Sequence, residues 1–442
     1  MAKTKKSTTS LPLADRLQSA LVPEEKQPYE IPKNWAWVKL GGVCNFERGI
    51  TFPATAKSKE MKDGLIPCLR TANVQEELDI SDFIYVDRSY MKENPNKLTR
   101  VEDIIMSSAN SRELVGKVSY VKNLPCEMTF GGFLLTIRAN RNILSKYLFF
   151  MLRNEFLAGH FMQESTQTTN IANINTTILG SYPFPFPPLA EQERIVARLE
   201  SLLGKLDEVK ERVQNSLESF KLRKASVLHK AFHGELTEKW REKKDIPFST
   251  WKNSTIGQVI QVHSGKNLTS KQMITEGKIP VYGGNGITGY HNESNVPVGT
   301  VVIGRVGFYC GSVHYISEPA WVTDNALVVS FSEMDFQIRY LYFALSHANL
   351  RQNNSSTAQP VISASKISSI PITIPTLAEQ EEIVRLLDQF FEHENQAKTQ
   401  LKTVLEKIES LKKSILMKAF RGKLGTHNPT DENVIETLKN MI

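Results

Sequence analysis

The sequence Leu189-Ala-Glu-Gln-Glu-Arg-Ile-Val196 recurs as Leu377-Ala-Glu-Gln-Glu-Glu-Ile-Val384, at an offset of 188 residues. Without a gap, the same offset carries Lys230-Ala-Phe-His-Gly-Glu-Leu236 onto Lys418-Ala-Phe-Arg-Gly-Lys-Leu424. Two matches in one register are not a chance event, and an internal repeat of this kind determines the architecture. Prolines precede both copies, so each copy follows an extended stretch: Pro183 and Pro187 in the first, Pro371 and Pro375 in the second.

Each copy contains a long heptad pattern. Apolar residues recur in alternating steps of four and three, at positions 195, 199, 202, 206, 209, 213, 220 and 227, and again at 383, 387, 390, 397, 401, 404, 408, 411 and 415. A heptad sustained over this length predicts two coiled-coil helices, each of roughly 45 residues and about 65 to 70 Å long. Ser216, Arg223 and Glu394 interrupt the pattern, and they either set the register of the helices or lie at an exposed edge of the seam.

The regions before the two helices also correspond, although more loosely. Trp35 and Leu40-Gly41 match Trp251 and Ile256-Gly257, Ile66-Pro67 matches Ile279-Pro280, and Tyr147-Leu148-Phe149-Phe150 matches Tyr340-Leu341-Tyr342-Phe343. Short runs rich in β-branched and aromatic residues lie between these landmarks and are separated by Gly and Asn, which favours strands. Each repeat is therefore predicted to be a compact α+β domain followed by a long helix.

Composition limits the possible functions without choosing one. A chain of 442 residues is long enough for two domains, and its net charge of +7 weakly favours a polyanionic partner. The cysteines Cys44, Cys68, Cys126 and Cys310 form no Cys-x-x-Cys pair, so we expect buried, reduced thiols. No apolar run reaches the roughly 18 residues of a membrane span, and residues 1–10 lack the apolar core of a signal peptide. We expect a cytoplasmic protein without a membrane partner.

The repeated helix starts and ends, together with the duplicated order of domain and helix, resemble the specificity subunit of type I restriction-modification systems. The resemblance covers roughly residues 32 to 425. It implies an α+β fold in which two tandem target recognition domains are each followed by a long conserved helix, and the two helices form an antiparallel coiled coil with pseudo-two-fold symmetry. The boundaries that we expect are an N-terminal arm (1–31), a first recognition domain (32–187), a central helix (188–243), a second recognition domain (244–375), a C-terminal helix (376–425) and a tail (426–442).

The resemblance also implies the function and the partners. Each recognition domain would read one half of a bipartite double-stranded DNA target, with the helices as the spacer. Because the two domains differ in sequence, the two half-sites should differ. Two methyltransferase subunits would bind along the helices, restriction subunits would complete the complex, and the specificity subunit itself would carry no catalysis. We expect the repeated helix starts to face these partners, through Leu189, Glu191, Gln192, Leu377, Glu379 and Gln380.

Residues that can read DNA gather on predicted loops in matching places. Base readout in the major groove uses Arg, Lys, Asn, Gln, Ser or Thr on positioned loops, whereas phosphates are bound by Lys, Arg and backbone amides. The candidates in the first domain are Arg70, Asn73, Ser107, Asn110, Arg112, Lys117, Thr166, Thr168 and Asn170. The candidates in the second domain are Tyr282, Asn285, His291, Arg305, Tyr309, Asn325 and Gln359. For any one of them, a solvated loop side chain is the alternative interpretation.

Other motifs favour no cofactor. The glycine runs at 283–286 and 304–307 lack the spacing of phosphate-binding loops and are predicted to be turns near DNA. The nine histidines show no His-Glu-x-x-His or comparable spacing, so no metal is predicted. A basic run on the second helix is either a phosphate contact or a solvated face: Lys407, Lys412, Lys413, Lys418, Arg421 and Lys423.

Two other classes of function remain as alternatives. The chain could itself be a DNA methyltransferase or nuclease, but it has no Asn-Pro-Pro-Tyr or Asp-Pro-Pro-Tyr motif, no cofactor loop of the required spacing and no nuclease carboxylate-lysine cluster. A coiled-coil scaffold without DNA specificity would explain the helices. It would leave the two divergent domains, with their polar loops, without a purpose.

Overall fold

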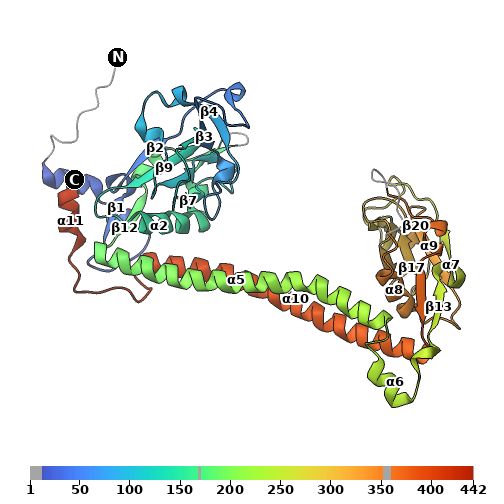
Figure 1. Cartoon of the computed structure of the whole chain (residues 1–442). Helices are drawn as coiled ribbons and strands as arrows, with labels where there is room; N and C mark the ends of the chain where they lie inside the picture. Colours follow the sequence, from blue (N-terminus) through green and yellow to red (C-terminus); the bar gives the residue numbers. More distant parts are fainter. Residues whose placement is uncertain (1–11, 168–170, 352–359, 442) are drawn as a thin grey trace. The chain divides into compact units, whose positions relative to one another are not determined.

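The computed structural model describes residues 12–167, 171–351 and 360–441 (Figure 1). The chain divides into two compact units. Unit 1 comprises residues 1–211 and 404–442, and unit 2 comprises residues 212–403. Each unit therefore combines one mixed domain with one end of each long helix.

Unit 1 is built on a four-stranded antiparallel sheet in the order β2-β9-β5-β7. Its strands are Cys44–Arg48 (β2), Leu134–Ala139 (β9), Ile104–Ser107 (β5) and Val118–Tyr120 (β7). β5 is buried at all four positions, as expected for an apolar strand with neighbours on both sides.

Smaller sheets surround the main sheet of unit 1. β3 (Leu65–Leu69) pairs antiparallel with β4 (Ile84–Asp87) and parallel with β8 (Thr129–Phe130). β1 (Ala36–Lys39) pairs with β12 (Pro183–Phe186), and a third sheet has the order β10-β11-β6 (Thr166–Gln167, Ala172–Asn173 and Ala109–Asn110). The helices are α1 (Leu13–Ala20), α2 (Ser145–Leu157), α3 (His160–Glu164), α4 (Thr176–Ser181) and α11 (Val434–Met441).

Unit 2 repeats this topology. Its main sheet has the order β14-β20-β17-β18, with strands Ile260–Ser264, Ala326–Phe331, Val301–Gly304 and Val313–Tyr315. β15 (Ile279–Gly283) again pairs antiparallel with one strand, β16 (Gly286–His291), and parallel with another, β19 (Trp321–Val322). β13 (Lys252–Thr255) pairs with β21 (Pro371–Ile374), and the short helices are α6 (Glu238–Lys244), α7 (Ile256–Val259), α8 (Ile338–His347) and α9 (Ala364–Ser368).

Matching tyrosines occupy matching places in the two cores. Tyr147 of α2 is fully buried and donates a hydrogen bond to the carbonyl of Pro185 in β12 (2.9 Å). Tyr340 of α8 is also fully buried and donates to the carbonyl of Thr373 in β21 (2.8 Å). The predicted correspondence of these two helices is therefore confirmed.

The long helices are α5 (Leu189–Phe232) and α10 (Leu377–Phe420), with 44 residues each. In unit 1, Ile195 and Leu199 from the start of α5 share a core with Leu416 and Phe420 from the end of α10. In unit 2 the pairing is reversed, because the end of α5 shares a core with the start of α10. The two helices are thus antiparallel in each unit, as predicted.

The seam of the helix pair departs from the predicted heptad in unit 1. Val209 and Leu411 were expected in the seam, but they are 42% and 51% exposed. Lys412 is instead 5% exposed and pairs with Asp207. A long lysine stem can cover apolar surface while its ammonium reaches a carboxylate, which explains how a charged residue occupies a position next to the seam.

The polar interruptions of the heptad differ from one another. Arg223 pairs with Glu394 across the two helices of unit 2 over 3.3 Å, and the Glu394 side chain is buried. This pair fits the interpretation that a polar contact sets the register. Ser216 is exposed and bonds to the carbonyl of Arg212 on its own helix, so it lies outside the seam.

Three of the four cysteines lie in the interior of the protein. Cys44, Cys68 and Cys310 are buried, as predicted, but Cys126 is exposed. Burial raises the pKa of Cys68 to about 12. In the described part of the chain, none of the helices combines the length and the apolar character that crossing a membrane requires.

Candidate nucleic-acid interface

Four of the predicted DNA-reading residues of unit 2 come together at the ends of neighbouring strands. The backbone amide of Arg305, directly after β17, donates to the carbonyl of Asn325, directly before β20 (3.0 Å). The amide of Thr323 donates to the carbonyl of Tyr282 in β15 (2.9 Å). Asn285 lies in the turn between β15 and β16. We call Tyr282, Asn285, Arg305 and Asn325 the unit 2 loop cluster.

Side chains of this cluster are available to a ligand. Asn285 and Asn325 are exposed, and Arg305 is half-buried, with one guanidinium contact to the carbonyl of Asp324 at 3.4 Å. Tyr282 is half-buried beside the ring of His314, and burial raises the pKa of its phenol. The cluster therefore offers amide, guanidinium and phenol groups, which are donors and acceptors suited to base edges and phosphates.

Glycines hold these loops close together. A Cβ on Gly304 would lie 2.4 Å from the carbonyl oxygen of Gly284, and a Cβ on Gly284 would lie 2.3 Å from the carbonyl oxygen of Val306. Gly286 has a φ of +79° in the turn between β15 and β16. Gly284 and Asn285 form a turn, as predicted, whereas Gly304 ends β17 and Val306 forms a bridge with Val361. In both runs, glycine permits the close approach of the backbones.

The other candidates of unit 2 have different positions. Tyr309 is 54% exposed on the loop that returns to Gly304. His291 lies at the far end of β16 from the turn, where its ring meets Trp321 edge-on, so the structure does not bring it to the cluster. Gln359 lies outside the described residues, but the neighbouring Pro360 accepts a hydrogen bond from the amide of Gly307 (3.2 Å).

In unit 1 the equivalent place is the end of β5. The amide of Ser107 donates to the carbonyl of Lys117, and Asn110 donates from its side chain to the Ser107 hydroxyl (3.0 Å). Asn110 belongs to β6, which pairs with β11, and β11 pairs with β10, which contains Thr166. We call Ser107, Asn110, Lys117 and Thr166 the unit 1 loop cluster.

The unit 1 loop cluster is less open than the unit 2 loop cluster. Ser107 is completely buried, so its predicted role in base readout does not fit its position. Lys117 bonds to the side-chain oxygen of Gln75 (2.6 Å), and burial lowers its pKa against the opposing effect of Glu76. Thr166 is exposed and Asn110 is half-buried, so these two keep polar groups at the surface.

Arg70 and Asn73 organise a loop of unit 1. The Asn73 side chain accepts from the amide of Arg70 (2.7 Å) and donates to the carbonyls of Asp79 and Asp82 (2.8 and 2.7 Å). Asn73 is only 2% exposed, so its side chain holds the loop together and is not available to DNA. Arg70 is partly exposed and pairs with Asp82.

The remaining candidates of unit 1 are Arg112, Thr168 and Asn170. Arg112 is exposed on the loop after β6. Thr168 and Asn170 lie outside the described residues.

The repeated helix starts are anchored inside the units. Gln192 donates to the carbonyls of Asn142 and Pro187 and accepts from the amide of Leu144. In the same way, Gln380 donates to the carbonyls of Asp335 and Pro375 and accepts from the amide of Gln337. The motif therefore fixes each helix start to its own domain.

The glutamates of the motif are anchored as well. Glu191 accepts from Thr426 and pairs with Arg194, whereas Glu379 accepts from Thr237, Arg241 and Trp251. Glu191, Gln192, Glu379 and Gln380 all have no exposed surface. The prediction that these four side chains contact partner subunits does not fit this burial. Leu189 and Leu377, which are 41% and 40% exposed, can still offer surface to a partner.

The basic run of α10 is divided between buried and exposed positions. Lys412 is buried in ion pairs. Arg421, directly after α10, is exposed, and its guanidinium lies over the ring of Tyr29 at 4.8 Å. Lys407, Lys413, Lys418 and Lys423 are exposed. The interpretation as one solvated face is therefore wrong for Lys412.

The structure brings together three histidines that the sequence analysis did not single out. His229 and His233 are four residues apart at the end of α5, which is a spacing that puts two metal ligands on one helix face. The structure adds His347 from α8 to this pair. The i,i+4 spacing could have identified two of the three residues, but the third depends on the tertiary fold.

Comparison with known proteins identifies the family. The model of the type I restriction modification DNA specificity domain matches residues 32–219 and 248–407, once in each repeat. The chain belongs to the type I restriction-modification DNA specificity family. The resemblance stated from the repeated motifs is thereby confirmed.

Relatives in the type I specificity family match over most of the chain. The type I restriction enzyme EcoKI specificity subunit of Escherichia coli (strain K12) is 26% identical over 425 residues, which cover 89% of this chain and 90% of that protein. The StySPI specificity subunit of Salmonella potsdam is 26% identical over 426 residues, with the same coverage.

Solved structures support the specificity-subunit fold. A chain from a type I restriction-modification system aligns with a TM-score of 0.68 and 20% identity, over 90% of this chain and 100% of that chain. The HsdS subunit from Thermoanaerobacter tengcongensis aligns with a TM-score of 0.55 and 20% identity, over the same shares. The α+β fold with two recognition domains and two long packed helices is thus that of type I specificity subunits.

Proposed function

We propose that this chain reads an asymmetric, bipartite double-stranded DNA target, with one half-site for each recognition domain. The observation that carries the proposal is the double match of the specificity family to the two repeats. Each repeat has its own cluster of polar loops at the end of the equivalent strand, β5 or β17. Because the residues of the two clusters differ, the two half-sites should differ in sequence.

The chemistry of each cluster suggests how the half-sites are read. In unit 2, Arg305 can contact a guanine edge or a phosphate, and Asn285 and Asn325 can bond to adenine edges. In unit 1, the exposed Arg112 and Thr166 and the half-buried Asn110 offer similar groups. Thr168, Asn170 and Gln359 remain candidates on the basis of the sequence alone.

We also propose that the chain docks methyltransferase subunits, two per chain, and restriction subunits, and that it performs no catalysis itself. The relatives are named as specificity subunits of restriction enzymes, so a division of labour among subunits is the expected arrangement. Leu189 and Leu377 are exposed apolar residues at the two helix starts and are the partner contacts that we favour.

Selection from a pool of random duplexes tests the function directly. The purified chain, with its cognate methyltransferase, is incubated with the pool, and the retained duplexes are sequenced. Enrichment of one split sequence supports recognition of a bipartite target. Retention without any selected sequence would point to a scaffold. In a parallel incubation without the methyltransferase, cleavage or methylation of the duplexes would point to an enzyme.

Exchange of one domain tests the assignment of the half-sites. Residues 32–187 are replaced by the corresponding domain of a relative with a different target, and the selection is repeated. The proposal predicts that one half of the selected sequence changes and the other half stays. A change in both halves contradicts independent reading.

A further inference from the structure

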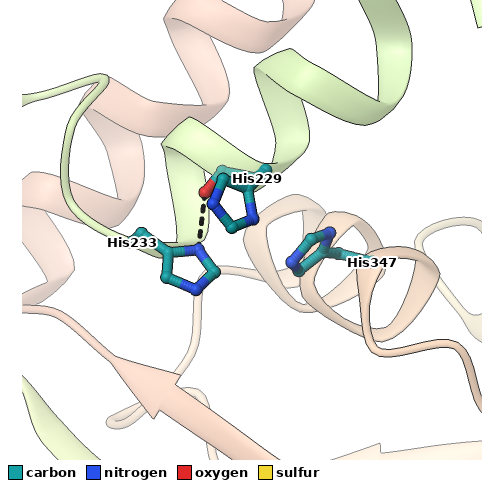
Figure 2. Close-up of side chains that lie close together, drawn as sticks. All are labelled: His229, His233 and His347. Atoms are coloured by element: carbon teal, nitrogen blue, oxygen red, sulfur yellow. Dashed lines mark hydrogen bonds between the residues drawn. The ribbon is translucent and has the colours of Figure 1, made fainter. Parts of the chain in front are cut away.

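Three histidine side chains of unit 2 lie together (Figure 2). The DNA recognition and subunit docking proposed above do not involve these residues. His229 lies in the last turn of α5, His233 follows the end of that helix, and His347 is the last residue of α8. One ring nitrogen from each residue lies within 4.8 Å of one from each of the others. Each imidazole can donate one lone pair to a metal ion.

The local backbone places two of these ligands. His229 and His233 are four residues apart, so their side chains leave the same face of the helix end. Their ring centroids are 3.8 Å apart, and both side chains are exposed. Because they are exposed, the rings can rotate without disturbing the core.

A hydrogen bond fixes the tautomer of His233. Its Nδ1 lies 2.8 Å from the backbone carbonyl oxygen of His229, which Figure 2 shows as a dashed line. A carbonyl oxygen only accepts, so Nδ1 must carry the proton. In the neutral ring, Nε2 then has a free lone pair, which is the arrangement found in metal-binding histidines whose other nitrogen is hydrogen-bonded.

The third ring is held by the core. His347 stacks on the buried ring of Phe232, with centroids 5.2 Å apart and an interplanar angle of 19°. His347 is itself half-buried, so this packing holds its ring in place. One ligand is thus preplaced by packing, while the other two are adjustable.

The fold does not require these histidines. The offset of 188 residues places Met417 and Arg421 of α10 where α5 has His229 and His233, and the match of Tyr147 with Tyr340 places Asn154 where α8 has His347. Unit 1 therefore builds the same helix junction with other residues. The three histidines are a feature of unit 2 that its packing does not demand.

We propose that His229, His233 and His347 bind one divalent transition-metal ion of the Zn²⁺ class. Three imidazole nitrogens suit Zn²⁺ and its neighbours Co²⁺, Ni²⁺ and Cu²⁺, and a water molecule would complete a tetrahedral site. Ligand atoms around tetrahedral Zn²⁺ lie about 3.3 Å apart, given nitrogen-metal distances of about 2.0 to 2.1 Å. A shift of the exposed His229 side chain, which leaves the hydrogen bond from His233 to the His229 backbone in place, would bring the nitrogens toward that separation.

The ion would join two elements of unit 2. It would link the end of α5 to the end of α8, next to the buried Phe232, and so stabilise the attachment of the long helix to the second recognition domain. Since a metal that binds only the folded state stabilises it by mass action, the effect should appear in the unfolding of the whole chain.

Metal titration of the intact chain tests the proposal. The chain is prepared without an affinity tag, stripped with EDTA and dialysed, and Co²⁺ is added while the visible absorption is recorded. We expect d–d bands of a tetrahedral site that saturate at one ion per chain and disappear on addition of Zn²⁺. Zn²⁺ should also raise the thermal unfolding midpoint of the wild-type chain.

Substitutions separate this site from general histidine binding. His229→Gln and His347→Gln should each weaken Zn²⁺ binding by about tenfold or more and remove the rise in midpoint. His263→Gln changes an exposed histidine of β14 and should leave both unchanged. Because His229 is exposed, its variant keeps the core, and its midpoint without metal verifies the fold.

Two results would overturn the proposal. One is the absence of saturable Co²⁺ and Zn²⁺ binding by the stripped wild-type chain. The other is binding by His229→Gln and His347→Gln with the affinity and stoichiometry of the wild type. Neither result affects DNA recognition, which rests on other residues.

Discussion

Arg241 donates a hydrogen bond to Glu379 over 2.6 Å, and both side chains are buried in unit 2. The same carboxylate accepts from the Thr237 hydroxyl (2.7 Å) and the Trp251 indole (2.8 Å). One carboxylate therefore connects the start of α10 to the segment that follows α5 and to Trp251, the residue directly before β13. In unit 1, the corresponding Glu191 is buried with other partners, Thr426 and Arg194.

Removing the arginine should strongly destabilise unit 2. Arg241→Met leaves the buried charge of Glu379 without its cation, and breaking a buried ion pair in this way costs about 3 to 5 kcal/mol. Urea unfolding followed by circular dichroism measures the loss. Arg385→Met is the matched control, since Arg385 pairs with Glu382 at the surface and its loss should leave the free energy of unfolding almost unchanged. Equal effects of the two substitutions would argue against a special role for the buried pair.

Asn73 should matter for stability and not for base readout. Asn73→Ala removes an oxygen that accepts one hydrogen bond and an NH2 group that donates two, all within a buried loop. The substitution should lower the free energy of unfolding by about 1 to 3 kcal/mol. The selected DNA sequence should stay the same in chains that remain folded. Arg112→Ala is the converse control, because its exposed side chain should leave the unfolding free energy almost unchanged and weaken DNA retention. A new base preference in folded Asn73→Ala protein would contradict this prediction.

Arg305 distinguishes a base contact from a phosphate contact. Arg305→Ala should weaken binding by about 1 to 3 kcal/mol and relax one base position if the guanidinium grips a guanine. If it instead binds a phosphate, all sequences should weaken equally, and the dependence of affinity on salt should become shallower. Binding isotherms at several salt concentrations, on the selected duplex and its single-base variants, give the answer. Lys252→Ala removes an exposed charge on β13 and serves as the control.

How far the sequence predicts this molecule depends on whether the signal is periodic. The duplicated helix ends and the matching Tyr147 and Tyr340 predicted the repeat, both long helices and the mixed domains. Val209 and Leu411 were predicted to lie in the seam but are exposed. A heptad pattern identifies the apolar face of a helix, but it does not show which residues of that face contact the other helix. The burial of Lys412 could not be predicted, since it depends on Asp207 from the other helix.

The candidate interface was predicted by region better than by residue. The strand ends at Ser107 and Gly304 do lie in equivalent places, but polar residue type alone did not distinguish the exposed Asn285 from the buried Asn73. Asn73 is buried because its amide satisfies three backbone groups, which is a tertiary arrangement without a local signal. The histidine cluster was missed for the same reason, since His347 is more than a hundred residues from the other two.

His314 should make unit 2 less stable in mild acid. Burial lowers its pKa below the ordinary value of 6.5, while it packs beside Tyr282 and bonds to Ser312. As the pH falls below about 6.5, the unfolded chain takes up the proton more readily than the folded chain, so this histidine lowers the free energy of unfolding. Unfolding measured in EDTA between about pH 8 and pH 5 should show a smaller loss for His314→Gln than for the wild type. An identical loss in both proteins would assign the pH dependence to other groups.

Gly304 connects the packing of the unit 2 loop cluster to its proposed function. A methyl group there would lie 2.4 Å from the carbonyl oxygen of Gly284 and 2.8 Å from the Ser312 hydroxyl, and a backbone carbonyl cannot rotate out of the way. Gly304→Ala should therefore displace the loop of Arg305. We expect selection of the half-site read by unit 2 to be lost, while the half-site read by unit 1 is still selected. Gly204→Ala is the control, because a Cβ at this position in α5 meets nothing within 4 Å, and the better helix former should stabilise the chain by about 1 kcal/mol. Duplex pools in which only one half is randomised measure the two effects separately. Loss of both half-sites in a folded Gly304→Ala protein would show that the two domains do not read DNA independently.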